Sequence, residues 1–151
     1  NLLELWGSAL RERCTEGGES HGAKAARQYA LRGARWEGAL GFPVLFEITI
    51  PALIDALDQG LTHQAAQLQA LFHTMASLDD TNLVSRGGME GLRWAQTQAK
   101  RFLANGGMAQ ATGRAQATAV HAAFVERRLS PGGSADLLAA ACWVVRISAA
   151  P

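Results

Sequence analysis

Residues 78–92 read LDDTNLVSRGGMEGL, and the rest of the chain is arranged around them. The stretch contains three acidic residues, an Asn, an Arg and a Gly-Gly pair, and it lies between two segments with helical periodicity. This density of polar residues and helix breakers exceeds what a plain connection needs. Because loops held by a rigid scaffold carry much of protein function, this loop is the first candidate for a site.

The segments before the loop predict a helical hairpin. Thr49 is expected to cap a helix that has Pro51 in its first turn and ends at Gly60. Thr62 is expected to cap the next helix, whose apolar residues form one stripe. Residues 44–48, VLFEI, have strand-like composition, but no second strand is available to pair with them. We therefore expect them to be extended or helical.

The segments after the loop predict three more helices. The first runs from Glu90 to Ala104 and the second covers residues 114–129. Ser134 is expected to cap the last, Ala135 to Ile147, which is apolar nearly all round and is therefore expected in the core.

The N-terminal third predicts two helices and an irregular segment. The helices are expected over residues 2–13 and 20–32, whereas three glycines and a proline predict irregular structure over 33–43. In total the pattern predicts an all-α bundle of six to seven helices without a sheet, forming one domain over residues 1–151.

Composition excludes several classes of protein. Net charge is +1 and the basic residues are scattered, which argues against a nucleic-acid partner. The longest apolar run, Leu137 to Val145, is far shorter than the ~20 residues that cross a bilayer. The two cysteines, Cys14 and Cys142, form no Cys-x-x-Cys pattern and predict neither a disulfide scaffold nor a zinc site. We expect a cytoplasmic protein without a membrane partner.

Asp79, Asp80 and Asn82 form a candidate metal site. Carboxylate and amide oxygens are the ligands of Mg²⁺, which usually keeps waters and substrate phosphates in its shell. The alternative is a helix end followed by an Asx turn, with the Asp side chain accepting from nearby backbone.

Two glycine-containing stretches are candidate anion sites. In the first, Arg86 and Gly87-Gly88 precede a helix, whose free N–H groups favour anions. In the second, Gly132-Gly133 lets the backbone approach a ligand beside the Ser134 hydroxyl. A surface Arg and a plain capped helix explain the two stretches equally well, and Asp136 would repel a phosphate unless a metal lay between them.

Four blocks stand out, in order: Gly33-Ala34-Arg35-x-Glu37-x-x-x-Gly41-Phe42-Pro43, Asp80-Thr81-Asn82-x-x-x-Arg86-Gly87-Gly88-x-Glu90-Gly91-Leu92, Asn105-Gly106-Gly107 and Arg128-Leu129-Ser130-Pro131-Gly132-Gly133-Ser134-Ala135-Asp136-Leu137-Leu138. Taken together, they resemble the triphosphoribosyl-dephospho-CoA synthase family.

The resemblance implies an all-helical enzyme that transfers the triphosphoribosyl group of ATP to the ribose 2′-hydroxyl of 3′-dephospho-CoA and releases adenine. Its product is the prosthetic-group precursor of an acyl carrier protein, of either citrate lyase or malonate decarboxylase. The substrates would be ATP and 3′-dephospho-CoA, with Mg²⁺ as cofactor.

The resemblance also suggests roles for individual residues. Glu37 or Glu90 would act as the base or stabilise the sugar cation. The residues expected to bind substrate phosphates are Arg35, Arg86, Gly87, Gly88, Ser130, Gly132, Gly133 and Ser134. The residues expected to bind Mg²⁺ are Asp79, Asp80, Asn82 and Asp136.

The chain departs from the family in two ways. Members usually have Gly where this chain has Trp36, and they are longer, with an N-terminal region that carries further motifs. The resemblance thus implies a C-terminal portion, which would associate with the N-terminal portion or with itself. The competing hypothesis is a non-catalytic helical or nucleotide-binding module that retains the family loops.

Overall fold

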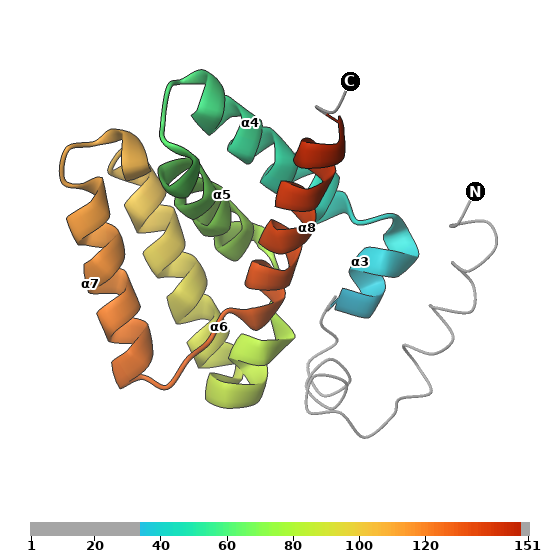
Figure 1. Cartoon of the computed structure of the whole chain (residues 1–151). Coiled ribbons are helices and arrows are strands. Elements are labelled where there is room, and N and C mark those ends of the chain that lie inside the picture. The colour runs from blue at the N-terminus through green and yellow to red at the C-terminus, as the bar shows by residue number, and fades with distance from the viewer. Residues whose placement is uncertain (1–33, 149–151) are drawn as a thin grey trace.

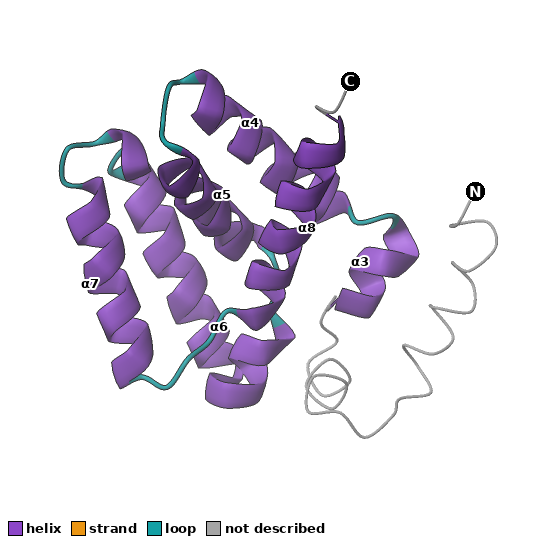
Figure 2. Ribbon diagram, viewed as in Figure 1, coloured by secondary structure: helices purple, strands orange, loops and turns teal. Residues whose placement is uncertain are grey.

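The computed structural model describes residues 34–148, and every regular element within them is helical (Figures 1 and 2). This confirms the predicted all-α class. The helices expected over 2–13 and 20–32 lie outside the described residues. The described elements are α3 (Ala34–Leu40), η1 (Leu45–Thr49), α4 (Ile50–Asp58), α5 (His63–Ser77), α6 (Thr81–Ala104), η2 (Gly107–Ala109), α7 (Gly113–Glu126) and α8 (Gly132–Ser148).

Helix α5 is the centre of the described fold, because it packs against α4, α6 and α8. Thr62 caps it as predicted, its hydroxyl accepting from the N–H of Ala65 at 3.3 Å. One face of α5 buries the small residues Ala66 and Ala70, and the opposite face buries Phe72 and Met75. The small face allows close approach, and the large face fills the space toward α6 and α7.

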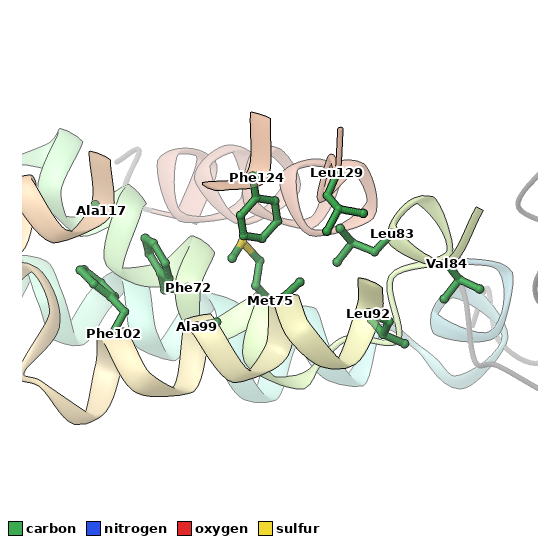
Figure 3. Close-up of a cluster of buried hydrophobic side chains, with 11 residues drawn as sticks. Phe72, Met75, Leu83, Val84, Leu92, Ala99, Phe102, Ala117, Phe124 and Leu129 are labelled. Atoms are coloured by element: carbon green, nitrogen blue, oxygen red, sulfur yellow. The ribbon is translucent and has the colours of Figure 1, made fainter. Parts of the chain in front are cut away.

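Two buried clusters follow from these two faces. The first cluster lies among α5, α6 and α7, and in it the ring of Phe72 stacks on Phe102 with centroids 3.9 Å apart (Figure 3). The second lies among η1, α4, α5 and α8 and contains Leu45, Leu53 and Leu137. Together the clusters fix α6 and α8 on α5, and those two helices carry the specific motifs.

The segment before α4 is helical rather than extended, and the predicted cap at Thr49 is wrong. Residues 45–49 form a π-helix that continues directly into α4, and Thr49 itself has helical φ/ψ. Its buried hydroxyl lies 3.1 Å from the carbonyl oxygen of Val44 and 2.9 Å from the hydroxyl of Thr74 on α5. Thr49 therefore joins two helices. Gly60, with φ +82°, follows the end of α4 as expected.

The predicted irregular stretch over 33–43 is wrong over residues 34–40, which form α3. The chain leaves the helical conformation only after α3, where Gly41 and Phe42 have positive φ of 84° and 59°.

The predicted loop of residues 78–92 is also largely helical. Helix α6 begins at Thr81, nine residues earlier than expected at Glu90, and Gly88 alone has non-helical dihedrals, φ 63° and ψ −168°. The glycine thus breaks a helix rather than belonging to a loop, since that backbone conformation is open almost only to glycine.

Helix α8 differs from prediction at its start and in its burial. It begins at Gly132, so Ser134 lies inside the helix and is not its cap. The helix is also not enclosed by the core: Trp143 is 63% exposed and Ile147 is 50% exposed, and only one face, with Leu137 and Ala141, is buried. None of the helices in residues 34–148 is long and apolar enough to span a membrane.

Candidate functional site at the helix junction

The two most specific sequence blocks meet at the carboxylate of Asp80, which is only 1% exposed. Oδ1 accepts from the backbone N–H of Asn82 at 2.9 Å and of Gly133 at 3.3 Å. Oδ2 accepts from the N–H of Ser134 at 2.9 Å and from its hydroxyl at 3.0 Å. One carboxylate therefore caps the starts of both α6 and α8, and we call this contact the Asp80 junction. Its negative charge lies at the positive ends of two helix dipoles.

Gly133 in α8 favours this approach, because a side chain there would crowd the carboxylate of Asp80. A Cβ at Gly133 would lie 3.1 Å from Oδ1 and 3.2 Å from Cγ of Asp80. A Cβ at Gly132 would lie 2.6 Å from Nδ2 of Asn82. The Gly-Gly pair thus lets the first turn of α8 lie directly on the first turn of α6.

Leu129 holds the connection from α7 to α8 against α6, where that connection passes over the helix (Figures 1 and 2). A Cβ at Gly87 would lie 2.6 Å from Cδ2 of Leu129, and one at Gly91 would lie 3.1 Å from it. Gly87 therefore makes room for a buried leucine. Leu129 stands inside the quoted motif, but the sequence reasoning gave it no role.

Asp80 does not fit a direct metal ligand in this arrangement. Both of its oxygens are occupied by N–H and O–H donors, and a metal would have to displace them. Asn82 and Asp136 are exposed and Asp79 is half-buried. Among residues 34–148, no three His, Cys, Asp or Glu side chains are grouped as a metal site would require. Binding of Mg²⁺ by the exposed oxygens stays a prediction.

Arg86 and Glu90 are exposed on α6, on either side of the break at Gly88. Among residues 34–148, no atom lies within 4 Å of the position where a Cβ of Gly88 would be, so no described side chain covers this turn. A guanidinium, a helix restart and a turn that no described side chain covers occur together here, and this combination is chemically able to accept an anion.

Glu37 is buried in α3, and its carboxylate accepts a hydrogen bond from the segment that directly follows α3. Its Oε2 accepts from the N–H of Val44 at 3.0 Å. Burial raises the pKa of Glu37, while hydrogen bonds from the N–H groups of Val44 and Leu45 act in the opposite direction. The described hydrogen bonds of Glu37 thus lead to the start of η1 and not to the Asp80 junction. The side chain of Arg35 lies outside the described side chains.

Ser130 is half-buried and, with Pro131, lines one end of a groove between α5 and α7. On α7 the groove is lined by Arg114, Thr118 and His121, and Arg114 lies at the end away from Ser130. None of these three residues is among the site residues predicted from the sequence. Their spacing of four and three along a predicted helix is the signal that would have placed them on one edge.

The fold and the junction define an all-helical domain in which two motif-bearing helix starts share one buried carboxylate. Residues 3–150 match the family model "CitG: ATP:dephospho-CoA triphosphoribosyl transferase". The chain belongs to this family. The resemblance stated from the motifs is therefore confirmed.

Curated relatives carry the corresponding activity in their names. A probable 2-(5''-triphosphoribosyl)-3'-dephosphocoenzyme-A synthase of Acinetobacter calcoaceticus is 36% identical over 146 residues, which are 97% of this chain and 50% of that protein. One of Stutzerimonas stutzeri (strain A1501) is 40% identical over 132 residues, 87% of this chain and 46% of that protein. The 2-(5''-triphosphoribosyl)-3'-dephosphocoenzyme-A synthase of Klebsiella pneumoniae is 40% identical over 129 residues, 85% of this chain and 46% of that protein.

The chain spans about half the length of the curated relatives that it matches. No solved structure gives a significant match to it.

Proposed function

We propose that the chain takes part in transferring the triphosphoribosyl group of ATP to the ribose 2′-hydroxyl of 3′-dephospho-CoA, with release of adenine. The product would be the prosthetic-group precursor of an acyl carrier protein, of citrate lyase or malonate decarboxylase. The observation that carries the proposal is the Asp80 junction, because it brings together two family blocks that are 54 residues apart at Asp80 and Ser134. Family membership supplies the reaction.

In this reaction the bond between C1′ of the ATP ribose and N9 of adenine breaks, and a bond from C1′ to the acceptor 2′-oxygen forms. Adenine leaves with the bonding electron pair and is protonated, and the acceptor hydroxyl loses its proton to a base. The protein must hold the triphosphate, stabilise a cationic sugar and accept that proton.

The exposed groups beside the junction are assigned to the triphosphate. Arg86 supplies the guanidinium, and Gly87 and Gly88 supply the turn through which the backbone approaches the phosphates. Ser130 and Gly132, at the start of α8, stay candidates together with Arg35. The donors of Gly133 and Ser134 are held by Asp80, so these two predicted residues are not assigned to the phosphates. Asp80 acts as a positioning residue, since its four hydrogen bonds fix both helix starts.

Mg²⁺ would be bound together with the triphosphate, whose charge it would neutralise. Among the predicted ligands, Asp79, Asn82 and Asp136 have oxygens that are not enclosed by the junction. These three residues remain the proposed ligands.

Glu90 is the preferred proposal for the base or the sugar-cation stabiliser. It is exposed and lies on the same helix as Arg86, whereas the carboxylate of Glu37 is only 5% exposed and accepts from the backbone of its own segment. A base has to reach its proton directly or through one water, and an exposed carboxylate does so more readily.

A partner is proposed from two facts. The relatives are about twice as long as the matched region, and several large apolar side chains are exposed on the described surface. The most exposed on η1 and α8 are Phe46 at 52% and Trp143 at 63%. In a protein as long as these relatives, a further portion would cover such side chains; a second copy of the chain would do the same. Without that cover the chain would be a non-catalytic or nucleotide-binding module, which is the second candidate.

The experiment is incubation of the purified chain with ATP, Mg²⁺ and 3′-dephospho-CoA, with free adenine followed by chromatography. Adenine release that requires dephospho-CoA is expected. Glu90→Gln should lower the rate by about 100-fold or more if Glu90 is the base. Glu126→Gln, an exposed glutamate on α7, is the matched control and should leave the rate unchanged.

Absence of adenine release, with ATP bound, would favour the nucleotide-binding module. Absence of both would contradict the proposed function for this chain.

A further inference from the structure

A groove of about 380 Å³ between α5 and α7 has no part in the roles assigned above, except that Ser130 lines its end. Its wall on α5 is apolar and consists of Leu68, Leu71, Phe72 and Met75. Its floor toward α7 includes Ala117 and Phe124. Volumes of about 300–1,000 Å³ with mainly apolar walls and a few polar groups are typical of small-molecule sites.

The edge of the groove on α7 is polar. Arg114, Thr118 and His121 are all exposed there and follow one another at spacings of four and three. Val125 continues the same edge and is 61% exposed. At 1.5 Å per residue, this edge is about 16 Å long from Arg114 to Val125. The groove thus offers an apolar wall facing a row of groups that can form hydrogen bonds.

The two ends of the groove differ. At one end Arg114 Nη1 donates to Oε1 of Gln64 on α5 at 3.2 Å and bridges the two helices. At the other end lie Ser130 and Pro131, which directly precede the Gly132-Gly133 turn on Asp80. A molecule held at Ser130 can therefore extend into the groove.

We propose that this groove binds the pantetheine arm of 3′-dephospho-CoA, an inference that rests on the proposed function. The acceptor consists of an ADP unit joined to a long arm with two methyl groups, two amides and a thiol. Such an arm needs apolar contact along its length together with partners for its amides. The α5 wall supplies the contact, and the α7 edge supplies the donors and acceptors.

The size of the groove favours this occupant over a protein segment. A helix with side chains is about 10 Å across, so a piece about 16 Å long occupies roughly 1,300 Å³. That volume is larger than all the empty space of the groove, which is about 990 Å³ and includes open solvent. A single extended chain is the better match.

The test compares 3′-dephospho-CoA with ADP, which has the same nucleotide without the arm, by calorimetric titration. The wild-type chain should bind dephospho-CoA more tightly than ADP. Thr118→Trp fills the groove and should weaken binding of dephospho-CoA at least tenfold while leaving that of ADP unchanged. Ala122→Trp, at an exposed α7 position outside the groove lining, is the matched control and should change neither.

Leu68→Trp, on the opposite wall, is the second groove-filling variant and should behave like Thr118→Trp. Wild-type affinity for dephospho-CoA in both variants would overturn the inference, even if adenine release stands. If that result came with a changed mass in light scattering, the groove would be assigned to a second copy of the chain instead. A wild-type chain that bound neither ATP nor dephospho-CoA would overturn the proposed function itself.

Discussion

Asp80 and Glu37 are both buried carboxylates that accept backbone N–H groups at helix starts, but they connect very different parts of the chain. Glu37 accepts from Val44, seven residues away, and so closes one local turn. Asp80 accepts from Asn82 within its own turn and from Ser134, 54 residues away. The same chemistry therefore stabilises a local turn in one case and joins two helices in the other.

An acid within a family motif can therefore have a structural role, as Asp80 has in joining two helix starts. The four donors to Asp80 explain why Asp, Gly-Gly and Ser occur together in the motifs. Gly133 leaves room for the carboxylate of Asp80, and that carboxylate accepts from the buried N–H and hydroxyl of Ser134. Direct contact with substrate stays a prediction for exposed neighbours such as Arg86.

The largest expected effect in this comparison is that of Asp80→Ala. The substitution removes the cap of α6 and leaves the N–H and hydroxyl of Ser134 buried without their acceptor. We expect a loss of about 3 kcal/mol in the free energy of unfolding. Urea unfolding followed by circular dichroism measures it.

Asp79→Ala is the matched control, because Asp79 is the adjacent, half-buried acid. It should change the free energy of unfolding by less than about 0.5 kcal/mol. Equal stability of the Asp80 and Asp79 variants would mean that Asp80 is not structural, and would return it to the predicted metal ligands.

A smaller effect is expected for Gly133→Ala. The added Cβ would lie 3.1 Å from Oδ1 of Asp80, and four hydrogen bonds keep the carboxylate from moving away. Crowding of this kind costs about 1–3 kcal/mol, against a gain of up to about 1 kcal/mol from replacing a helical glycine. We expect a net loss of about 1 kcal/mol.

A double-mutant cycle with Asp80→Ala sharpens this prediction. Once the carboxylate is gone, Gly133→Ala should become neutral or stabilising. The same loss in both backgrounds would show that the carboxylate is not what requires glycine at this position.

The smallest effect is expected for Glu37→Gln, and it depends on pH. Burial raises the pKa of Glu37 above its ordinary value of 4.5, so the folded protein binds the proton more tightly than the unfolded chain does. The contribution of this group to stability therefore falls as pH rises through the raised pKa. Gln keeps an oxygen for the Val44 N–H but does not titrate.

Thermal unfolding at pH 5 and pH 7 tests this sign. The melting temperature of Glu37→Gln minus that of wild type should be more positive at pH 7 than at pH 5. Glu126→Gln, at an exposed position, serves as the control. A difference between Glu37→Gln and wild type that does not change with pH would contradict the raised pKa.

Local signals predicted much of the helical fold. The cap at Thr62 and the helix end before Gly60 depend on neighbouring residues, and both were correct. The two misplaced caps, Thr49 and Ser134, have the right residue type, but each hydroxyl contacts another helix instead. Spacing within one segment carries no information about such partners.

The candidate site was predictable as a set of residues but not as a set of contacts. The sequence placed Asp80 among metal ligands, because nothing nearby shows that donors 53 and 54 residues away occupy its oxygens. The glycine pair predicts a loop up to Gly88, although residues on both sides of Gly88 are helical. The roles of Arg86, Glu90 and the Mg²⁺ ligands stay predictions.

The distance along the chain between Asp80 and Ser134 also has a consequence for the order of folding. Bringing together residues separated by 54 positions costs roughly 3.5 kcal/mol of loop-closure entropy, whereas the hairpin of α5 and α6 forms from near neighbours. We therefore expect the Asp80 junction to be a late contact, formed after α5 and α6 have packed. Changes at the junction should act mainly by speeding unfolding, and the surrounding helices should assemble at nearly the normal rate.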